Sequence, residues 1–207
     1  ASAKWLEIPS EEKYMGKGVS ACATCDGPFF KNQEVVVVGG GNSAMEEALF
    51  LASICAKVTI IHRRDAFRGE RVLQERVLNH DKIHVLWDSE VDEILGGEGQ
   101  EGVVESVRIV NNKSGEKTDV PAQGVFIAIG HKPNTDIFAG KLPMDDYGYI
   151  QVPAGSVTTD IPGVYAAGDV IDAVYRQAVT AAGLGCMAAL DAISYYDQLE
   201  QSTKKSA

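Results

Sequence analysis

Hydrophobic residues along this chain fall into short runs separated by glycine-rich or polar turns. Residues 35–38 are four valines bounded by glycine, a pattern typical of a strand buried on both faces of a parallel sheet. An apolar face then recurs at helical spacing in Met45, Ala48, Leu49 and Ala52. A second apolar run follows at residues 58–61. The pattern predicts a strand, a helix and a parallel strand, which is the start of an α/β domain.

The rest of the chain continues this alternation. We expect a solvated helix at 70–79, strands at 83–87 and 91–95, a hairpin of 103–110 with 118–120, and a buried strand at 124–129. Glycine and proline within residues 130–134 mark a hinge between two domains, which we place at 1–131 and 132–207. Beyond the hinge we expect short strands at 148–152 and 164–170 and a helix from 176–178 to about residue 195.

Composition limits the possible partners. The 207 residues, 45% hydrophobic and 23% charged, suffice for one large or two small globular domains. A formal net charge of −10 argues against nucleic acid and anionic membrane as partners. No apolar run is expected to reach the length of a membrane span, and no signal peptide is recognisable, so the expected location is cytoplasmic.

The turn after the four valines carries the pattern Gly39-x-Gly41-x-x-Ala44. Gly39 permits a tight turn, Gly41 lets backbone approach a pyrophosphate, and Ala44 lets helix and strand pack closely. The N-terminus of the following helix supplies N–H groups and a positive dipole end for that pyrophosphate. The pattern therefore predicts a dinucleotide site, and a tight turn in an ordinary α/β domain is the alternative.

The end of the second strand indicates which dinucleotide would bind. An NAD site places an acidic residue there to bond the ribose 2′-hydroxyl. This chain instead has His62, Arg63 and Arg64, followed by Arg68. Because guanidinium groups bind phosphate through paired hydrogen bonds, the cluster favours the 2′-phosphate of NADPH over a solvated basic turn.

Cys22 and Cys25 form a Cys-x-x-Cys pair, which is either half of a metal site or a redox disulfide. A structural zinc site needs two further ligands, and Cys55 and Cys186 are single residues in apolar, helical surroundings. We therefore favour a redox pair and expect Cys55 and Cys186 to be buried and inert. The carboxyl of Asp26 could exchange the proton that thiol chemistry requires, or Asp26 could simply open a turn.

Six motifs along essentially the whole chain resemble, in order and spacing, the low-molecular-weight bacterial thioredoxin reductases. They are ACATCDG at 21–27, GGGNSA at 39–44, HRRDAFR at 62–68, AIGH at 128–131, YAAGDV at 165–170 and RQA at 176–178. The resemblance implies an α/β fold with a Rossmann-like three-layer NADPH domain and the C-terminal portion of a split FAD-binding domain. It also implies a homodimer that passes electrons from NADPH through FAD and the disulfide to thioredoxin.

The resemblance also assigns roles to residues. Cys25 would face the flavin, Cys22 would attack thioredoxin, and Asp26 would be the general acid and base. The NADPH contacts would be Gly39, Gly41, Asn42, Ser43, Ala44 and Glu46, with His62, Arg63, Arg64 and Arg68 at the 2′-phosphate and Gly130 also in the cofactor site. The flavin contacts would be Gly168, Asp169, Val170, Arg176, Gln177 and Ala178, with Asp169 on the ribityl chain. No metal is expected.

One departure from the family pattern concerns the flavin. The family's flavin domain begins with its own strand, glycine turn and helix upstream of the cysteines, whereas this chain has a single such fingerprint. We therefore expect a fragment with a whole nicotinamide domain and the closing third of a flavin domain, inactive by itself and without bound FAD. A stand-alone NADPH-binding module and a related flavin-dependent disulfide reductase with another donor or acceptor remain the alternatives.

Overall fold

The computed structural model describes residues 1–97 and 102–205. These residues divide into two compact units. One unit is Ala3–Gly130, and the other combines Ala1–Ser2 with His131–Ala207. The short strands β1 (Ser2–Ala3) and β10 (His131–Lys132) pair with each other where the chain passes between the units.

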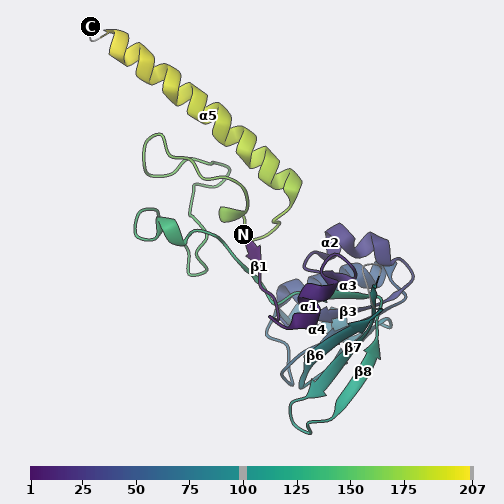
Figure 1. The fold of residues 1–207 in the computed structure, drawn as a ribbon. Helices are drawn as coiled ribbons and strands as arrows, with labels where there is room; N and C mark the ends of the chain where they lie inside the picture. The colour runs from purple at the N-terminus through teal and green to yellow at the C-terminus, as the bar shows by residue number, and fades with distance from the viewer. Residues whose placement is uncertain (98–101, 206–207) are drawn as a thin grey trace. The chain divides into compact units, whose positions relative to one another are not determined.

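A five-stranded parallel sheet forms the centre of the first unit (Figure 1). Its order is β2 (Val19–Ser20), β9 (Gly124–Ile127), β3 (Glu34–Val38), β4 (Lys57–Ile61) and β5 (Ile83–Leu86). In the central strand, Val36 pairs with Thr59 on one side and Val125 on the other. Val36 and Val37 are fully buried, which explains the continuous apolar run, because both faces of this sheet are covered.

Helices cover one face of this sheet. The helices α3 (Asn42–Ile54) and α4 (Arg71–Leu78) pack there, and the short helices α2 (Ala23–Asp26) and η1 (Gly27–Phe30) lie beside α3. The core on this side contains Met45 and Leu51 of α3, Ile60 of β4 and Phe126 of β9. The helical spacing seen in the sequence therefore corresponds to the buried face of α3.

A second sheet covers the opposite face. Its strands β6 (Ser89–Gly96), β7 (Val104–Asn111) and β8 (Lys117–Pro121) are antiparallel, and α1 (Pro9–Tyr14) packs against β6. Ile94 and Val107 from this sheet share one core with Val36 and Ile61 of the parallel sheet. Helices, parallel sheet and antiparallel sheet make three layers, so the predicted α/β, Rossmann-like three-layer architecture is confirmed.

The second unit contains little regular structure besides its last helix. It has the short helices η2 (Asp136–Phe138) and η3 (Gly168–Val170), the long helix α5 (Ala178–Lys205), and a small core of Leu142, Ile150 and Ala166. The strands predicted at 148–152 and 164–170 were wrong. A strand requires a ladder of hydrogen bonds, and these stretches make only single bridges, Met144 with Ile150 and Thr158 with Tyr165.

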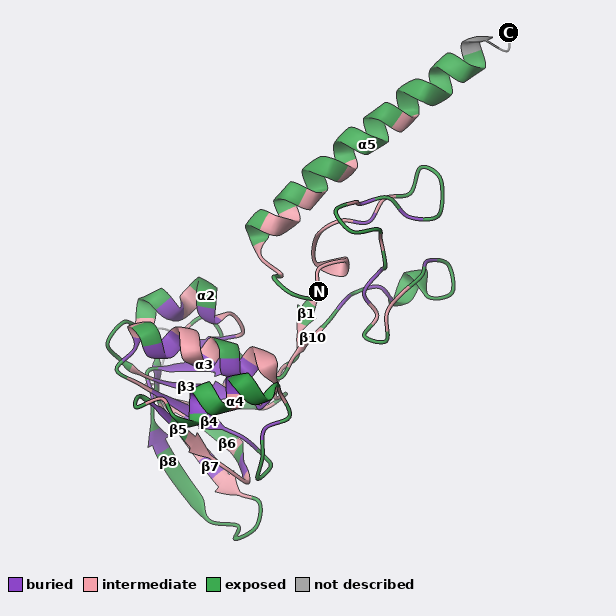
Figure 2. Ribbon diagram, turned by 180° about the vertical axis from the view of Figure 1, so that it is seen from behind, coloured by how far each residue is buried: buried purple, intermediate pink, exposed green. Residues whose placement is uncertain are grey.

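The helix α5 is longer and more exposed than the sequence pattern predicted. It continues past residue 195 to Lys205, because no glycine or proline interrupts 196–205. Figure 2 shows its surface as almost entirely exposed or intermediate. The expectation that no run could reach membrane-span length was also wrong, since Ala178–Thr203 qualifies by length and composition. The run contains three acidic residues, Asp191, Asp197 and Glu200, and length and composition do not place the helix in a membrane.

Candidate functional site

The glycine turn after β3 is held tightly by its surroundings. Gly39 has φ 151°, a conformation that favours glycine. A Cβ there would overlap the carbonyl oxygen of Ala128 and lie 2.8 Å from the Cβ of Ala44, which is itself fully buried. Gly39 and Ala44 therefore let β3, α3 and β9 approach closely, as the Gly-x-Gly-x-x-Ala pattern requires.

Gly41 has a different environment. It is the N-cap of α3 with φ −98° and ψ −175°, it makes no side-chain cap, and a Cβ there would meet nothing within 4 Å. The next side chain, Asn42, is turned to Glu70, whose backbone N–H donates to Asn42 Oδ1 over 2.7 Å. The first turn of α3 thus presents backbone N–H groups beside open space, which suits an anionic ligand.

His62 lies at the end of β4 with its ring buried. Its Nε2 is 3.0 Å from the carbonyl oxygen of Ala66, and the ring packs near Phe67 and Trp87. A Cβ on Gly40 would overlap this ring, so the middle glycine of the turn is needed for packing. Burial lowers the pKa of His62, and the three neighbouring guanidinium groups lower it further, while the bond to Ala66 acts in the opposite direction.

The positive charge at this strand end therefore comes from arginine. Arg63, Arg64 and Arg68 are all exposed, and the backbone N–H of Arg68 donates to the carbonyl oxygen of Gly40 over 2.9 Å. This bond places the second half of the basic cluster directly against the glycine turn. The buried histidine supports the loop by packing, and the exposed arginines supply the guanidinium groups that attract phosphate.

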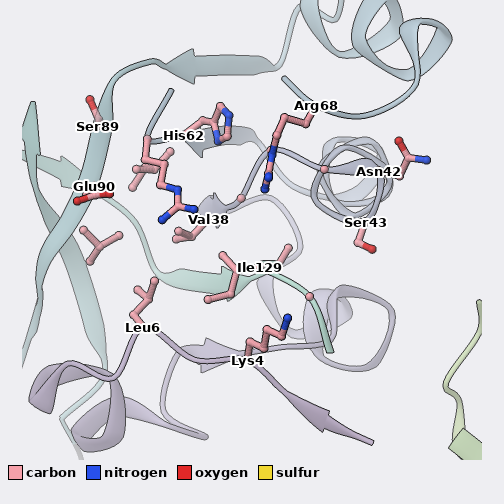
Figure 3. A pocket seen from close by; sticks show the side chains of 18 of the residues that line it. Lys4, Leu6, Val38, Asn42, Ser43, His62, Arg68, Ser89, Glu90 and Ile129 are labelled. Atoms are coloured by element: carbon pink, nitrogen blue, oxygen red, sulfur yellow. The ribbon is translucent and has the colours of Figure 1, made fainter. Parts of the chain in front are cut away.

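A cavity of about 650 Å³ joins the glycine turn to the basic cluster. Figure 3 shows it at the carboxyl ends of the central parallel strands, where doubly wound α/β sheets bind their ligands. Of the predicted nucleotide residues, it is lined by Gly39, Gly41, Asn42, Ser43, His62, Arg63, Arg68 and Gly130. Arg64, Ala44 and Glu46 do not line it: Arg64 is an exposed neighbour, Ala44 is buried beneath the turn, and Glu46 is exposed on α3.

The opposite wall of the cavity was missed by sequence reasoning. Figure 3 shows Lys4 and Leu6 from the N-terminal segment and Glu90 from β6 at the cavity. Ile8 and Val91 also line it. Lys4 is fastened there by a backbone hydrogen bond of 2.9 Å to the carbonyl oxygen of Gly130. The sequence carries no periodic signal for this wall, because Trp5, Leu6 and Ile8 all pack against one core and Glu7 between them has φ 62°.

The dithiol pair lies in the same unit. A disulfide joins Cys22 and Cys25, and the backbone N–H of Cys25 donates to Cys22 Sγ over 3.2 Å, so Cys22 caps the short helix α2. Ser20, at the end of β2, accepts from the backbone N–H of Cys22 over 3.0 Å and donates its hydroxyl to Asp26 Oδ2 over 2.6 Å. Ser20 thus holds the Asp26 carboxylate one turn from the disulfide, a role that the sequence pattern did not reveal.

The two other cysteines differ from each other. Cys55 is buried, as expected, and burial raises the pKa of its thiol above the ordinary value. Cys186 is exposed, so the expectation that it is buried was wrong. Its apolar neighbours in the sequence belong to α5, whose apolar window is not buried in the described chain.

These environments predict that the four cysteines become reactive toward a thiol reagent in three successive steps. In the native oxidised chain, a chromogenic thiol reagent should react with Cys186 alone, because Cys22 and Cys25 are joined and Cys55 is buried. Mild reduction should add the two thiols of the pair, and denaturation should add Cys55. Stoichiometric zinc that protects Cys22 and Cys25 from the reagent would contradict the redox interpretation.

The predicted flavin residues lie in the second unit. Gly168, Asp169 and Val170 form η3, which packs against α5, and Arg176 and Gln177 lead into that helix at Ala178. Asp169 Oδ2 accepts from the amino group of Ala1 over 3.2 Å. The structure therefore brings both sequence motifs together within this unit.

Arg176 is held in an unusual backbone conformation, with φ 49°. The carboxylate of Asp172 accepts hydrogen bonds from the backbone N–H groups of Val174, Tyr175 and Arg176. Although burial opposes ionisation, these bonds and one from Thr180 hold the pKa of Asp172 below its usual value. Asp172 thereby fixes the turn that carries Arg176.

Metal-binding side chains are not clustered in the described parts of the chain. Across residues 1–97 and 102–205, three or more His, Cys, Asp or Glu side chains never gather closely enough to hold a metal ion. The chemically active features of the first unit that the structure does show are the disulfide, the Asp26 carboxylate held by Ser20 and the basic cavity.

Comparison with known proteins gives a consistent result. The pyridine nucleotide-disulphide oxidoreductase family matches residues 1–185. A thioredoxin reductase of Rickettsia conorii is 57% identical over 198 residues, which cover 96% of this chain and 64% of that protein. The thioredoxin reductase of Coxiella burnetii is 51% identical over 209 residues, covering 98% of this chain and 64% of that protein.

Solved structures agree with this. The thioredoxin reductase of Streptococcus pyogenes matches with a TM-score of 0.88 and 41% identity, over 96% of this chain and 63% of that one. The enzyme of Giardia duodenalis matches with a TM-score of 0.87 and 42% identity, over 95% of this chain and 63% of that one. The chain thus spans a little under two thirds of the length of these relatives.

Proposed function

We propose, from the premise that this chain belongs to the pyridine nucleotide-disulphide oxidoreductase family, that it is the NADPH-binding and dithiol-bearing part of a thioredoxin reductase. The observation that carries the proposal is the combination, within one unit, of an arginine-rich nucleotide cavity and a disulfide with a carboxylate beside it. Residues 1–131 would form the nicotinamide domain, and residues 132–207 would be the closing segment of a flavin domain.

The cavity fits a dinucleotide phosphate. The uncapped N-terminus of α3 at Gly41 would bind the pyrophosphate, and Arg63, Arg64 and Arg68 would bind the 2′-phosphate. Gly39 and Ala44 would shape the turn, His62 would support the basic loop from below, and Gly130 would line the opposite end. Asn42 and Ser43 at the start of α3 complete the contacts, and Glu46 is assigned to the same site from the family pattern.

The reaction would consume NADPH and a proton and produce NADP⁺, while the Cys22–Cys25 bond is broken and two thiols form. FAD, when bound, supplies the relay that accepts hydride and passes electrons to sulfur. The Cys22 thiolate would then attack the disulfide of thioredoxin, and Cys25 would release the mixed disulfide and restore the Cys22–Cys25 bond. Asp26, held by Ser20, would take and return the proton that these exchanges require.

The second unit would contribute one wall of the FAD site. Asp169, in η3, would bond the ribityl chain, and the turn fixed by Asp172 would present Arg176 to the flavin ring. Gly168, Val170, Gln177 and Ala178 flank these two residues along the chain. We further propose that the whole protein is a cytoplasmic homodimer whose protein substrate is thioredoxin.

A chimera tests this proposal. The part of the Rickettsia conorii relative that this chain does not match would be joined to residues 1–207. We expect a yellow protein with a flavin absorbance band that reduces thioredoxin with NADPH, and a Cys25→Ser variant that keeps the colour but loses turnover. A chimera that binds NADPH and flavin without reducing thioredoxin would instead favour another acceptor, and one that binds NADPH alone would favour a binding module.

A further inference from the structure

The turn between β7 and β8 lies against the basic loop of residues 62–68. Asn112 donates its side-chain N–H to the carbonyl oxygen of Arg63 over 3.3 Å, and its backbone N–H donates to the carbonyl oxygen of Asp88 over 2.6 Å. Lys113 Nζ lies 2.8 Å from Asp88 Oδ2 and 3.9 Å from Asp65 Oδ2. A turn far away in sequence therefore contacts both the backbone and the charges of the proposed 2′-phosphate site.

The turn is itself rigidly built. Asn111 Oδ1 accepts from the backbone N–H groups of Lys113 and Ser114, each over 3.0 Å. Gly115 supplies the left-handed position, with φ 73°. Because side-chain amides and glycine of this kind stabilise tight turns locally, Asn112 and Lys113 are held in place before any ligand binds.

The basic loop is also fastened by the backbone of Asp88 and Ser89. The backbone N–H of Asp88 donates to the carbonyl oxygen of Arg64 over 3.1 Å, and that of Ser89 donates to the carbonyl oxygen of His62 over 3.0 Å. Asp88 has φ 53°, which an aspartate tolerates better than most residues. Asp88 is thus shared by the basic loop and the β7–β8 turn, and its carboxylate is largely covered, with 19% of the side chain exposed.

Charge explains why Lys113 matters. Asp65 follows Arg63 and Arg64 directly in the sequence, and the backbone N–H of Asp88 donates to the carbonyl oxygen of Arg64. If both carboxylates were unpaired, they would repel a phosphate or compete with it for the guanidinium groups. The hydrogen bond to Asp88 raises the pKa of Lys113, desolvation opposes this, and the charges of Asp88 and Asp65 raise it further. The ammonium group of Lys113 therefore offsets the charges of these two carboxylates.

We propose that the β7–β8 turn is a positioning element for NADPH selectivity: Asn112 fixes the backbone at Arg63, and Lys113 keeps Asp65 and Asp88 from pairing with the arginines. The inference rests on the proposed nucleotide function and deepens it. The turn acts through the arginines, so it should change the affinity for the 2′-phosphate and not the binding of the rest of the nucleotide. NADH therefore serves as the internal reference.

Lys113→Met and Lys117→Met form a matched pair for the test. Lys117 lies on β8 of the same hairpin and also makes a 2.8 Å ion pair, with Asp92, so both substitutions remove one exposed positive charge and one similar contact. The dissociation constants of NADPH and NADH would be measured by calorimetry on the 207-residue chain at low and high salt. Thermal unfolding of each variant would show whether the fold is intact.

We expect Lys113→Met to weaken NADPH binding about fivefold at low salt and less at high salt, because the effect is electrostatic. NADH binding should stay within about a factor of two, Lys117→Met should change neither nucleotide, and Lys113→Arg should restore wild-type selectivity. Asn112→Ala should weaken NADPH by about threefold, in line with the loss of one hydrogen bond.

Four outcomes would overturn the inference. Equal effects of Lys113→Met and Lys117→Met would show that only net charge matters. Suppose that the wild-type chain does prefer NADPH. If the turn variants then lose affinity equally for NADPH and NADH, or if both keep the wild-type selectivity, the positioning role of the turn is rejected and the proposed function still stands. A wild-type chain with no preference for NADPH would reject the cofactor assignment and the positioning role together.

Discussion

NADPH is expected to bind the 207-residue chain at least about tenfold more tightly than NADH, and Arg63→Ala combined with Arg64→Ala is expected to remove most of that difference. Hydrogen bonds to charged groups contribute about 1.5–3 kcal/mol each, so even one retained bond to the 2′-phosphate gives this ratio. His62 cannot substitute for the arginines, because burial and the neighbouring guanidinium groups lower its pKa and favour the neutral ring.

The measurement compares the dissociation constants of both nucleotides by calorimetry. Arg71→Ala with Arg76→Ala is the matched control, since it removes two exposed arginines from α4, which do not line the cavity. NADH should bind all three proteins alike. Equal affinity of the unmutated chain for NADPH and NADH would refute the assignment of the basic cluster.

A second large effect is expected from Gly41→Asp, which should abolish nucleotide binding without harming the fold. Gly41 is an N-cap in an extended conformation with no atom near its missing Cβ, so aspartate can adopt this backbone without a clash. Its carboxylate would cap the first turn of α3, where aspartate is preferred, and would occupy the N–H groups that we assign to the pyrophosphate. Both nucleotides carry the pyrophosphate, so both should lose about a hundredfold or more in affinity.

Two control variants, Gly41→Ser and Gly39→Ala, separate the effect of the added carboxylate on nucleotide affinity from effects on the fold. Gly41→Ser caps the helix without added charge, so it should retain the stability and lose less affinity than the aspartate variant. Gly39→Ala should lower the thermal unfolding temperature, because its Cβ would overlap the carbonyl oxygen of Ala128. Tight NADPH binding by a folded Gly41→Asp chain would place the pyrophosphate elsewhere.

Much of the fold could be predicted because local pattern and tertiary environment agree in the first unit. The four valines of β3 indicate a strand buried on both faces, and the helical spacing of α3 indicates a helix buried on one face. The structure has both elements buried in this way. The second unit was predicted less well. Residues 148–152 and 164–170 have the composition of strands, but strand formation depends on a partner, and each finds only a single bridge.

The same distinction applies to the site. The glycine turn, the basic cluster and the Cys-x-x-Cys pair are contiguous motifs whose spacing alone implies chemistry, so they were identified directly. Lys4, Ser20 and Lys113 act through side chains or backbone that are remote in sequence from these motifs, and no local signal links them. The exposure of Cys186 was likewise misjudged, since an apolar helical sequence does not state which of its faces are covered.

The sequence by itself therefore determined the order of the strands and helices around the glycine turn, which two cysteines form the redox pair, and the positive charge at the end of β4. These follow from periodicity, from glycine's freedom at the turn and from the chemistry of residues that are neighbours along the chain. Only the tertiary structure decided that His62 is packed and its pKa lowered, that Ser20 holds Asp26, and that a hairpin turn reaches the basic loop. Burial and long-range hydrogen bonds arise only when distant segments meet, so a sequence read locally does not reveal them.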